Sequence, residues 1–344
     1  MKLFNPNGND SDKKLLGSDI TNILDLSNVK YPFFLSLVDE KIFPNNWLPQ
    51  EGSSLTEDRR QYYEELTDNE REVFNNILSF LVFLDSIQTN NLPAISEYVT
   101  LPEIKYFLSR QTWDEALHSR SYGYILSNML DRDEMNKIIY RWRDNPILLK
   151  RVSSIASIYE EAFDKQNDIN NERYFLLDLI ANYLLEGLYF YNGFQFFHNL
   201  ASRNLMIGTD IQIRYIQRDE NLHCVGFRNI INIFKDEGFN FDKELVYSMF
   251  KQAVDIELEF SFNIIGNNIL GMNKQSIEDY TYYLANKRLK EIGLEPIFPN
   301  RKNPYKHLEQ IASIDDETSN RSNQFEVRSI TYKDPSVLDG WDLI

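Results

Sequence analysis

The sequence predicts an all-α protein built as a bundle of about eight long helices. Chain breakers are sparse, with 13 Gly and 11 Pro in 344 residues, so few connections interrupt the apolar segments. Apolar residues recur at helical spacing, and no segment shows the strict alternation of a half-buried strand. Two Glu-x-x-His motifs, Glu115 to His118 and Glu220 to His223, lie inside such helical segments and indicate a functional core.

The N-terminal half begins with residues 1–55, which mix short apolar stretches with Asn, Pro and Gly. We expect an arm with one or two short helices there. The first long helix is predicted for about 67–91, because Thr67 and Glu70 form the capping-box pattern that starts a helix. The next is predicted for about 102–130, with a proline in its first turn, where proline is tolerated.

The later segments are also apolar at helical spacing. They predict helices at about 132–143, 146–166, 172–206, 209–236, 242–269 and 275–291. The segment 172–206 is apolar on nearly every face, which is typical of a helix in the middle of a bundle. We expect Gly208 to end this helix.

Composition limits the possible partners. The chain has 36 Lys and Arg against 52 Asp and Glu, a net charge of −16, which disfavours nucleic acid and anionic membranes as partners. No uncharged apolar run reaches the roughly 18 residues that a membrane span needs. Cys224 is the single cysteine, so no disulfide can form within the chain, and we expect a cytoplasmic protein.

The two Glu-x-x-His motifs carry the strongest chemical signal. Residues three apart share a helix face, so each motif offers a carboxylate and an imidazole to one point. Two such pairs, with one carboxylate from each of two further helices, make the dinuclear site of ferritin-like bundles. Asp85 and Glu186 are the candidates for the remaining positions, because each lies in an apolar run where an unpaired carboxylate is costly.

The predicted ligands are therefore Asp85, Glu115, His118, Glu186, Glu220 and His223. Surface carboxylates or buried ion pairs remain the ordinary explanation for any one of them. Carboxylate oxygens with imidazole nitrogens suit two ions of iron or manganese per chain. The lack of thiolates argues against iron–sulfur clusters and structural zinc.

One tyrosine is placed to take part in redox chemistry. Tyr122 follows His118 by four residues and Glu115 by seven, so it lies on the ligand face of its helix and could form a phenoxyl radical. With 20 tyrosines in the chain, chance placement is the alternative. Three apolar residues one turn from ligand candidates would line the same interior or simply pack the core: Phe190, Phe194 and Ile216.

Beyond about Pro296 the helical pattern stops, and residues 311–330 are rich in Ser, Asp, Asn and Glu. A polar stretch with a short apolar terminus is typical of a tail that orders on a partner, although a frayed terminus has the same composition. We predict an N-terminal arm (1–55), a ferritin-like metal-binding helical domain (56–295) and a flexible C-terminal tail (296–344).

The stretches FLDSIQ, EALHSRSY, LLEGLYFY and RDENLH resemble, in order and spacing, the metal-site segments of the small (β) subunit of class I ribonucleotide reductase. The resemblance covers about Phe43 to Leu270. It implies that the six predicted ligands bind two metal ions. It also implies that Tyr122 is the radical tyrosine, with the three apolar residues as its shell.

The resemblance further implies a relay of electrons and protons. A buried tryptophan, matched by Trp47, and the aspartate before the fifth ligand, matched by Asp219, lead toward the surface. A tail tyrosine completes the relay, and Tyr332 is the only tyrosine after Tyr305.

The implied activity is that of ribonucleoside-diphosphate reductase. Its large (α) subunit would bind the C-terminal tail and reduce ribonucleotides to deoxyribonucleotides. The resemblance also implies a homodimer and allows an activating flavoprotein as a further partner. Two questions stay open at this point: whether iron or manganese is bound, and whether Tyr122 or the metal pair is the oxidant. The stretch from Asp85 to Glu115 is shorter than in the common iron–tyrosyl members, and some relatives use manganese.

Two other functions fit the same fold. A dimetal oxidase or hydroxylase would act directly on a small molecule and would need an open pocket beside the metals. A metal-storage protein would need neither Tyr122 on the ligand face nor a tail with an apolar end.

Overall fold

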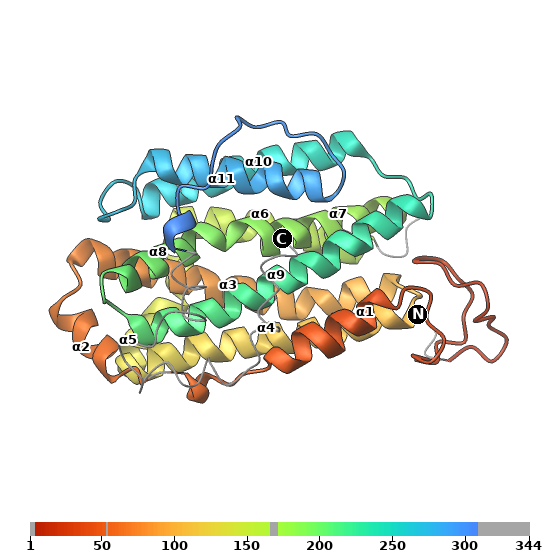
Figure 1. The fold of residues 1–344 in the computed structure, drawn as a ribbon, viewed down its shortest axis with the longest axis horizontal. Helices are drawn as coiled ribbons and strands as arrows, with labels where there is room; N and C mark the ends of the chain where they lie inside the picture. Colours follow the sequence, from red (N-terminus) through yellow and green to blue (C-terminus); the bar gives the residue numbers. More distant parts are fainter. Residues whose placement is uncertain (1–3, 53, 166–170, 309–344) are drawn as a thin grey trace.

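The computed structural model describes residues 4–52, 54–165 and 171–308. Across these residues the chain consists of helices and loops, and its one element of sheet pairing is an isolated bridge between Leu16 and Val99. The long helices lie roughly parallel or antiparallel to one another in a bundle (Figure 1). The all-α bundle predicted from the sequence is confirmed.

The N-terminal part holds more helix than predicted. Its helical elements are α1 (Phe33–Ser36), a π-helical turn (Leu37–Ile42), two 3-10 turns (Phe43–Asn45 and Pro49–Glu51) and α2 (Thr56–Glu64). The prediction has no counterpart for α2, because its sequence TEDRRQYYE is mostly charged and polar. The loop before α1 lies at one end of the bundle (Figure 1), where Thr100 N donates to Leu15 O over 2.9 Å.

Two long helices, α3 (Asp68–Tyr98) and α4 (Pro102–Met129), follow α2. The predicted capping box starts α3: the Glu70 amide donates to Thr67 Oγ1, and the Glu70 carboxylate accepts from the Thr67 amide. Pro102 stands in the first turn of α4, as predicted.

The predicted end of α3 near Asn91 is wrong. The helix continues through Pro93 to Tyr98. A proline inside a helix costs about 3 kcal/mol, since it removes a backbone donor. Leu92 and Ile95 are fully buried on either side of it, and burying two such side chains recovers roughly that amount. Tertiary packing therefore stabilises the helix beyond the proline.

After α4 the described residues contain seven further helices: α5 (Arg132–Ile139), α6 (Pro146–Asp164), α7 (Asn171–Leu184), α8 (Tyr191–Ser202), α9 (Ile207–Asp236), α10 (Lys243–Ile264) and α11 (Lys274–Glu291). A short 3-10 turn, Arg141–Arg143, joins α5 to α6. Asn145, Asp242 and Asn273 cap α6, α10 and α11, respectively, by accepting hydrogen bonds from backbone amides of the first turn.

The single helix predicted for 172–206 is interrupted. Between α7 and α8 the residues Leu185–Tyr189 form a π-helical turn, called the π-segment below. The helix also ends at Ser202 and not at Gly208. Asn204 and Met206 adopt left-handed backbone conformations, with φ of 63° and 56°, and these end the helix before the glycine is reached.

The helix predicted for 242–269 is shorter than expected. It ends at Ile264, because Gly266 takes φ 61° and donates its amide to Ser261 O over 3.0 Å. Glycine is the usual residue for this left-handed helix end.

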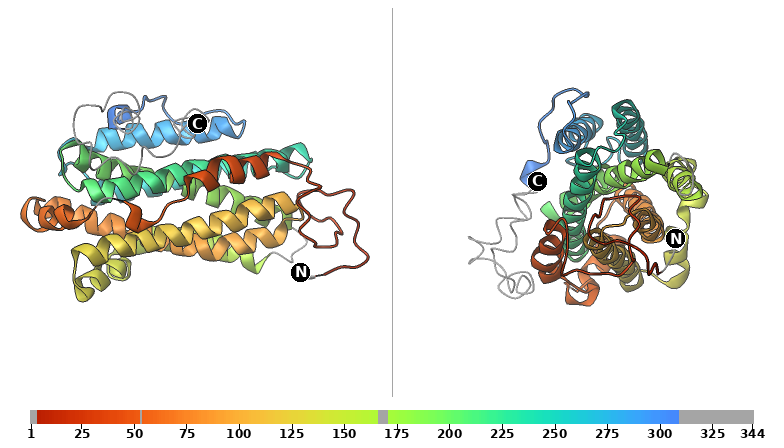
Figure 2. Two further views of the ribbon diagram at one scale, coloured as in Figure 1. Left: turned by 60° about the horizontal axis from the view of Figure 1, so that its bottom comes forward. Right: turned by 90° about the vertical axis from the view of Figure 1, so that its right-hand side faces the viewer.

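The order of side-chain contacts shows that α4 and α9 run antiparallel. Ser121 bonds Gln212 near one end of the pair, and His118 contacts Asp219 nearer the middle. Seen end-on in Figure 2, the long helices pack side by side, with α10 and α11 as a pair at one side of the bundle. The helices that carry the predicted ligands are thus neighbours.

A glycine sets how closely α4 and α9 approach. A Cβ added at Gly226 would lie 2.1 Å from Cζ of Phe107, so the phenyl ring occupies the space of a side chain on α9. Phe107 is fully buried and its ring also packs on Phe227. Only glycine fits at position 226 without moving one of the two helices.

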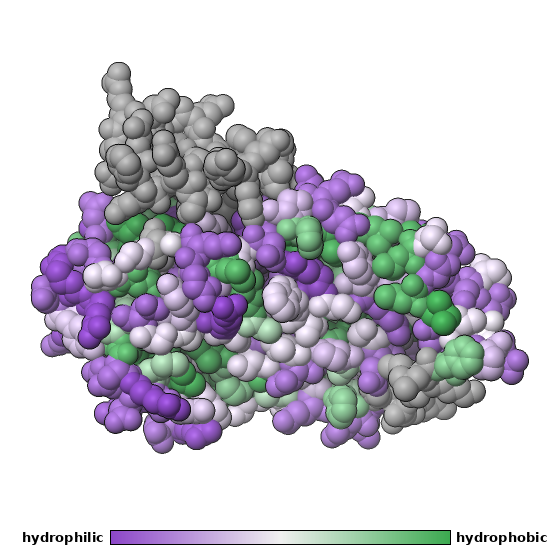
Figure 3. All heavy atoms as spheres, turned by 90° about the horizontal axis from the view of Figure 1, so that it is seen from below, coloured by the Kyte–Doolittle hydropathy of each residue, from purple (hydrophilic) through white to green (hydrophobic). Residues whose placement is uncertain are grey.

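No helix in the described ranges is both long and apolar enough to cross a membrane. On the face drawn in Figure 3, apolar residues form small patches among hydrophilic ones.

Candidate metal centre

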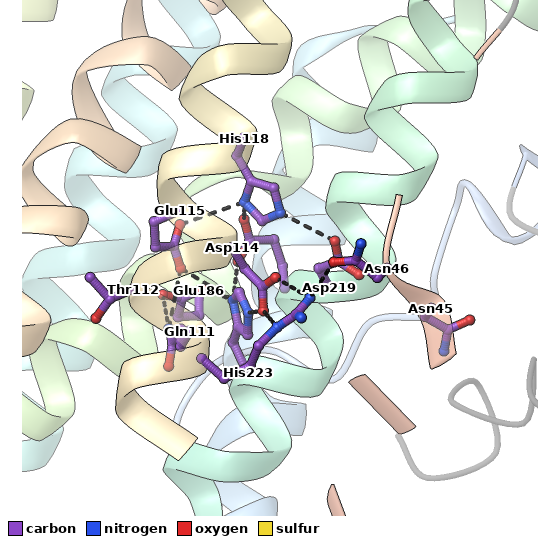
Figure 4. Close-up of polar contacts among 12 residues, drawn as sticks. Asn45, Asn46, Gln111, Thr112, Asp114, Glu115, His118, Glu186, Asp219 and His223 are labelled. Atoms are coloured by element: carbon purple, nitrogen blue, oxygen red, sulfur yellow. Dashed lines mark hydrogen bonds and ion pairs between the residues drawn. The ribbon is translucent and has the colours of Figure 1, made fainter. Parts of the chain in front are cut away.

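Four neighbouring segments bring the six predicted ligands together. Asp85 lies on α3, Glu115 and His118 on α4, Glu186 in the π-segment, and Glu220 and His223 on α9. Each of the six is fully buried. Figure 4 shows the side chains of α4, the π-segment and α9 converging on one another in the middle of the bundle.

In the first half of the cluster, His118 directs Nδ1 inward. This nitrogen lies 3.1 Å from Glu220 Oε1, 3.6 Å from Glu115 Oε2 and 3.9 Å from Asp85 Oδ2. One nitrogen therefore faces three carboxylates from three helices.

In the second half, His223 directs Nδ1 into the same interior. This nitrogen lies 3.2 Å from Glu115 Oε1, 3.3 Å from Glu186 Oε2 and 3.1 Å from Glu220 Oε2. The two histidines thus enter from opposite helices and share Glu115 and Glu220 between them.

The donor atoms fall into two overlapping groups, each with ligand atoms within 4.8 Å of one another. One group is Glu115, Glu186, Glu220 and His223, and the other is Asp85, Glu115 and His118. Glu115 belongs to both, as a carboxylate that bridges two ions does. Four carboxylates and two imidazoles make a set suited to a dinuclear metal site.

Several of these buried atoms make no hydrogen bond of regular geometry within the described part of the chain. They are both oxygens of Asp85, Oε2 of Glu115, Oε1 of Glu220 and Nδ1 of His118. Most buried polar atoms in proteins have a hydrogen-bond partner. Inward-facing atoms that lack one fit metal coordination.

The electrostatics of the cluster point the same way. Burial raises the pKa of Asp85 well above its ordinary value, and repulsion from Glu115 adds to the rise. Burial and repulsion from neighbouring glutamates likewise raise the pKa of Glu186. Burial would lower the pKa of His118 and His223, but the surrounding carboxylates outweigh it and raise both. Protons and divalent cations therefore compete for the same negative site.

Each histidine also touches a carboxylate on its outer side. His118 Nε2 lies 3.3 Å from Asp219 Oδ2, and His223 Nε2 lies 3.4 Å from Asp114 Oδ2 (Figure 4). An outer carboxylate of this kind orients a metal-bound imidazole. Sequence reasoning missed Asp114, although an aspartate stands directly before the glutamate in both motifs.

Two glutamines were also missed. Gln88 on α3 and Gln111 on α4 both donate to Glu186 Oε1, the latter over 2.8 Å. Tyr159 on α6 donates to Gln88 Oε1 over 3.0 Å. Helical spacing could have predicted both glutamines. Gln88 stands three residues after Asp85, and Gln111 stands four residues before Glu115, so each shares a helix face with a ligand candidate.

Trp47 and Asp219, predicted to act together, are in contact. The indole Nε1 donates to Asp219 Oδ2 over 2.7 Å, and both residues are buried. The indole also stacks on His118, with ring centroids 6.3 Å apart, and on Tyr215 at 5.1 Å. Arg218 contacts the other oxygen, Oδ1, of Asp219 at 3.1 Å. An unbroken chain of contacts therefore joins His118 to Trp47.

Tyr122 is fully buried on α4. Burial raises its pKa well above the ordinary value, and the charge of Asp85 adds to the rise. Its predicted apolar shell, Phe190, Phe194 and Ile216, is also fully buried, with the two phenyl rings stacked at 5.6 Å. Tyr332 lies outside the described residues.

The family model for the small chain of ribonucleotide reductase matches residues 24–304. This chain belongs to the ribonucleotide reductase small-chain family. It is 36% identical over 330 residues to the ribonucleoside-diphosphate reductase subunit beta of Treponema pallidum, covering 95% of this chain and 92% of the relative. The corresponding subunit of Halalkalibacterium halodurans is 31% identical over 346 residues, with 99% and 97% covered.

The fold agrees with this membership. The solved R2 subunit of ribonucleotide reductase from Clostridium botulinum is 39% identical and superimposes with a TM-score of 0.85, covering 91% of this chain and 98% of that one. The chain is thus a class I small subunit, the β subunit of a ribonucleoside-diphosphate reductase, which works with a large subunit.

The oxidase and storage alternatives are not favoured by these matches. An oxidase would also need a substrate pocket at the metals. A pocket of about 450 Å³ lies between α3 and α6, but it is lined by Ile87, Tyr159 and Phe163, among others, and by none of the six predicted ligands.

Proposed function

We propose that this small subunit binds two metal ions with Asp85, Glu115, His118, Glu186, Glu220 and His223, and stores in that centre the oxidising equivalent used by the large subunit. The observation that carries the proposal is the pair of overlapping donor groups that share Glu115. When bound, the ions supply the redox change that the side chains alone do not. Oxygen and imidazole donors suit iron and manganese alike.

We infer that Tyr122 is the residue oxidised beside the centre. An ordinary phenol has a pKa of about 10 and keeps its proton at neutral pH, and burial raises the pKa of Tyr122 further, so its oxidation would remove a proton together with the electron. Phe190, Phe194 and Ile216, all fully buried, would exclude the water that quenches a phenoxyl radical.

We further propose that the oxidising equivalent leaves through His118, Asp219 and Trp47, whose contacts support this route. Tyr332 would continue the route in a C-terminal tail, 296–344, that binds the large subunit. The arm (1–55) would then supply Trp47 to a central metal-binding domain (56–295). A homodimer, a cytoplasmic location and activation by a flavoprotein complete the proposal.

Electron paramagnetic resonance of the activated protein, read beside a metal analysis, tests the centre and its oxidant. The proposal expects two ions per chain and a tyrosyl signal that disappears in Tyr122→Phe. That substitution preserves ring packing, so stability should change little, while nucleotide reduction with the large subunit should collapse. Full activity in the Tyr122→Phe variant would mean that the metal pair, and not Tyr122, is the oxidant. Fewer than two ions in wild type would refute the centre itself.

A further inference from the structure

The π-segment that carries Glu186 is bound from outside by two buried arginines. A π-turn interrupts the regular ladder of a helix, so the carbonyl groups around it are open to partners from other elements. Two of these carbonyl groups, those of Gly187 and Tyr189, accept hydrogen bonds from guanidinium groups. The donors come from different helices.

Arg288 on α11 binds the first carbonyl. Its Nε donates to Gly187 O over 3.2 Å, and its side chain is only 3% exposed. Its Nη2 donates to Tyr191 Oη over 3.0 Å, at the start of α8. One guanidinium therefore joins α11 to both the π-segment and the helix after it.

Arg151 on α6 binds the second carbonyl. Its Nη2 donates to Tyr189 O over 2.6 Å. Its guanidinium packs against the rings of both Phe80 and Phe260, with its carbon 3.8 and 3.9 Å from their centroids, which lie 5.0 Å apart. The aromatic rings fix the plane of the group and leave little freedom to its hydrogen bond.

The charge of each arginine is balanced away from the metal centre. Arg288 pairs with Glu291 at 3.0 Å, and Arg151 pairs with Glu257 at 2.5 Å. Neither arginine makes an ion pair with Glu186 within the described residues. Neither guanidinium therefore neutralises the carboxylate of Glu186, while the backbone on its C-terminal side is held.

The sequence of the π-segment accommodates this arrangement. A Cβ added at Gly187 would lie 2.7 Å from Nε of Arg288 and 3.2 Å from Sγ of Cys224. The glycine next to Glu186 therefore provides the space that the guanidinium occupies.

We propose that Arg151 and Arg288 are positioning residues, which hold the π-segment in one register and so fix where the Glu186 carboxylate enters the cluster. This inference rests on the proposed role of Glu186 as a metal ligand. It gives two arginines outside the ligand set an indirect effect on the ion site that contains Glu186, and none on the site of Asp85 and His118.

The first test is anaerobic titration of full-length Arg288→Met with Mn²⁺, followed by calorimetry and electron paramagnetic resonance. Affinity at the site containing Glu186 should fall about ten- to a hundredfold, as for other residues that support ligands. Affinity at the site of Asp85 and His118 should stay within a few-fold of wild type. The spectrum should change from that of a coupled manganese pair to that of an isolated ion.

Tyr191→Phe is the control, because it removes a partner of Arg288, and a hydrogen bond to Asn221 on α9, but leaves the bond to Gly187 O. Both ions should bind it with wild-type affinity. The double variant Arg151→Met/Glu257→Gln removes the second arginine without leaving a buried unpaired charge, and it should weaken the same site as Arg288→Met.

Gly187→Ala keeps the proposal falsifiable if Arg288→Met does not fold. The added methyl displaces the guanidinium without removing a charge, and alanine favours the helix. A folded Gly187→Ala or Arg288→Met variant with wild-type affinity at both sites would overturn the inference. Glu186→Ala separates the two proposals: if it still binds both ions normally, the ligand assignment fails, whatever the arginine variants do.

Discussion

Asp114 and Asp219 occupy the same place in the two Asp-Glu-x-x-His motifs, and each contacts the outer nitrogen of the histidine on the opposite helix. Beyond that point the two halves of the centre differ. Each aspartate is bound by an arginine, Asp219 by Arg218 at 3.1 Å and Asp114 by Arg110 at 2.6 Å, but Asp219 also accepts a hydrogen bond from the indole of Trp47. That outer carboxylate therefore contacts an oxidisable ring in addition to a guanidinium, which cannot be oxidised.

The two halves therefore differ in their outer contacts although their local motifs are the same. The same five-residue pattern places a carboxylate behind each histidine. The distinction comes from the segment before α2, in which Trp47 contacts the half that contains His118. We infer that the half containing His118 exchanges electrons with the large subunit, while the half containing His223 is held in place.

The largest effect is expected where the halves meet. Glu115→Ala removes the one carboxylate common to both donor groups, so both ions should be lost from the purified protein. Asp85→Ala, which touches one group only, is the control and should keep one ion. Metal analysis of the folded variants decides, and two ions in Glu115→Ala would show that the halves are independent.

Asp219→Asn and Asp114→Asn compare the outer carboxylates directly. Both keep the side-chain shape but lose the charge that supports a histidine, so each should weaken metal binding about tenfold. Nucleotide reduction per bound metal should then collapse in Asp219→Asn and stay near wild type in Asp114→Asn. Equal activity per metal in the two variants would remove the distinction between the halves.

Trp47→Phe tests the connection without touching a carboxylate. The variant loses the indole donor, which should lower the free energy of unfolding by about 1–2 kcal/mol, measured by urea denaturation. Metal content should be unchanged and nucleotide reduction lost. Trp142→Phe, an indole that packs on Phe83 instead, is the control and should remain active. Retained activity in Trp47→Phe would exclude this exit route.

The last prediction concerns stability alone, at a buried carboxylate outside both halves, where no loss of metal or activity is expected. Burial raises the pKa of Asp178 from 3.8 to about 7, and its hydrogen bond from Asn91 offsets only part of the rise. The folded state therefore binds this proton more tightly than the unfolded state. Ionising this buried carboxylate lowers the free energy of unfolding. The loss is absent below about pH 4, grows until the pH passes about 7, and reaches at most about 4 kcal/mol.

Asp178→Asn keeps the acceptor for Asn91 and removes this charge. The stability of the variant relative to wild type should rise between pH 4 and pH 8, as measured by chemical denaturation. A stability difference that does not vary with pH would mean that burial leaves the pKa of Asp178 unchanged. Metal content serves as the control and should be the same in both proteins.

The ligand candidates could be predicted from the sequence because the faces of a helix depend only on spacing along the chain. Glu115 and His118 must share a face whatever surrounds them, and Gln111 and Asp114 were within reach of the same argument. Arg151 and Arg288 were not, since they meet the π-segment only through the packing of α6 and α11.

The interruptions of the helices were predicted least well. No local propensity predicts the π-segment, because LLEGLYFY has the pattern of a continuous helix. The contacts made there by Arg151, Arg288 and Cys224 come from segments distant in the sequence. The continuation of α3 past Pro93 likewise depends on burial of neighbours that the sequence does not locate.

The close approach of Phe107 and Gly226 has a consequence for the dimensions of the centre. His223 lies three residues before that glycine, on the same rigid rod, so the separation of the rods that bear the two histidines is set by hydrocarbon in steric contact. Such packing is nearly incompressible, unlike a loop held by solvated hydrogen bonds. The distance between two bound ions would then depend on how closely the Cζ end of the Phe107 ring packs against α9. Heating or pressure below the unfolding transition should leave that distance almost unchanged.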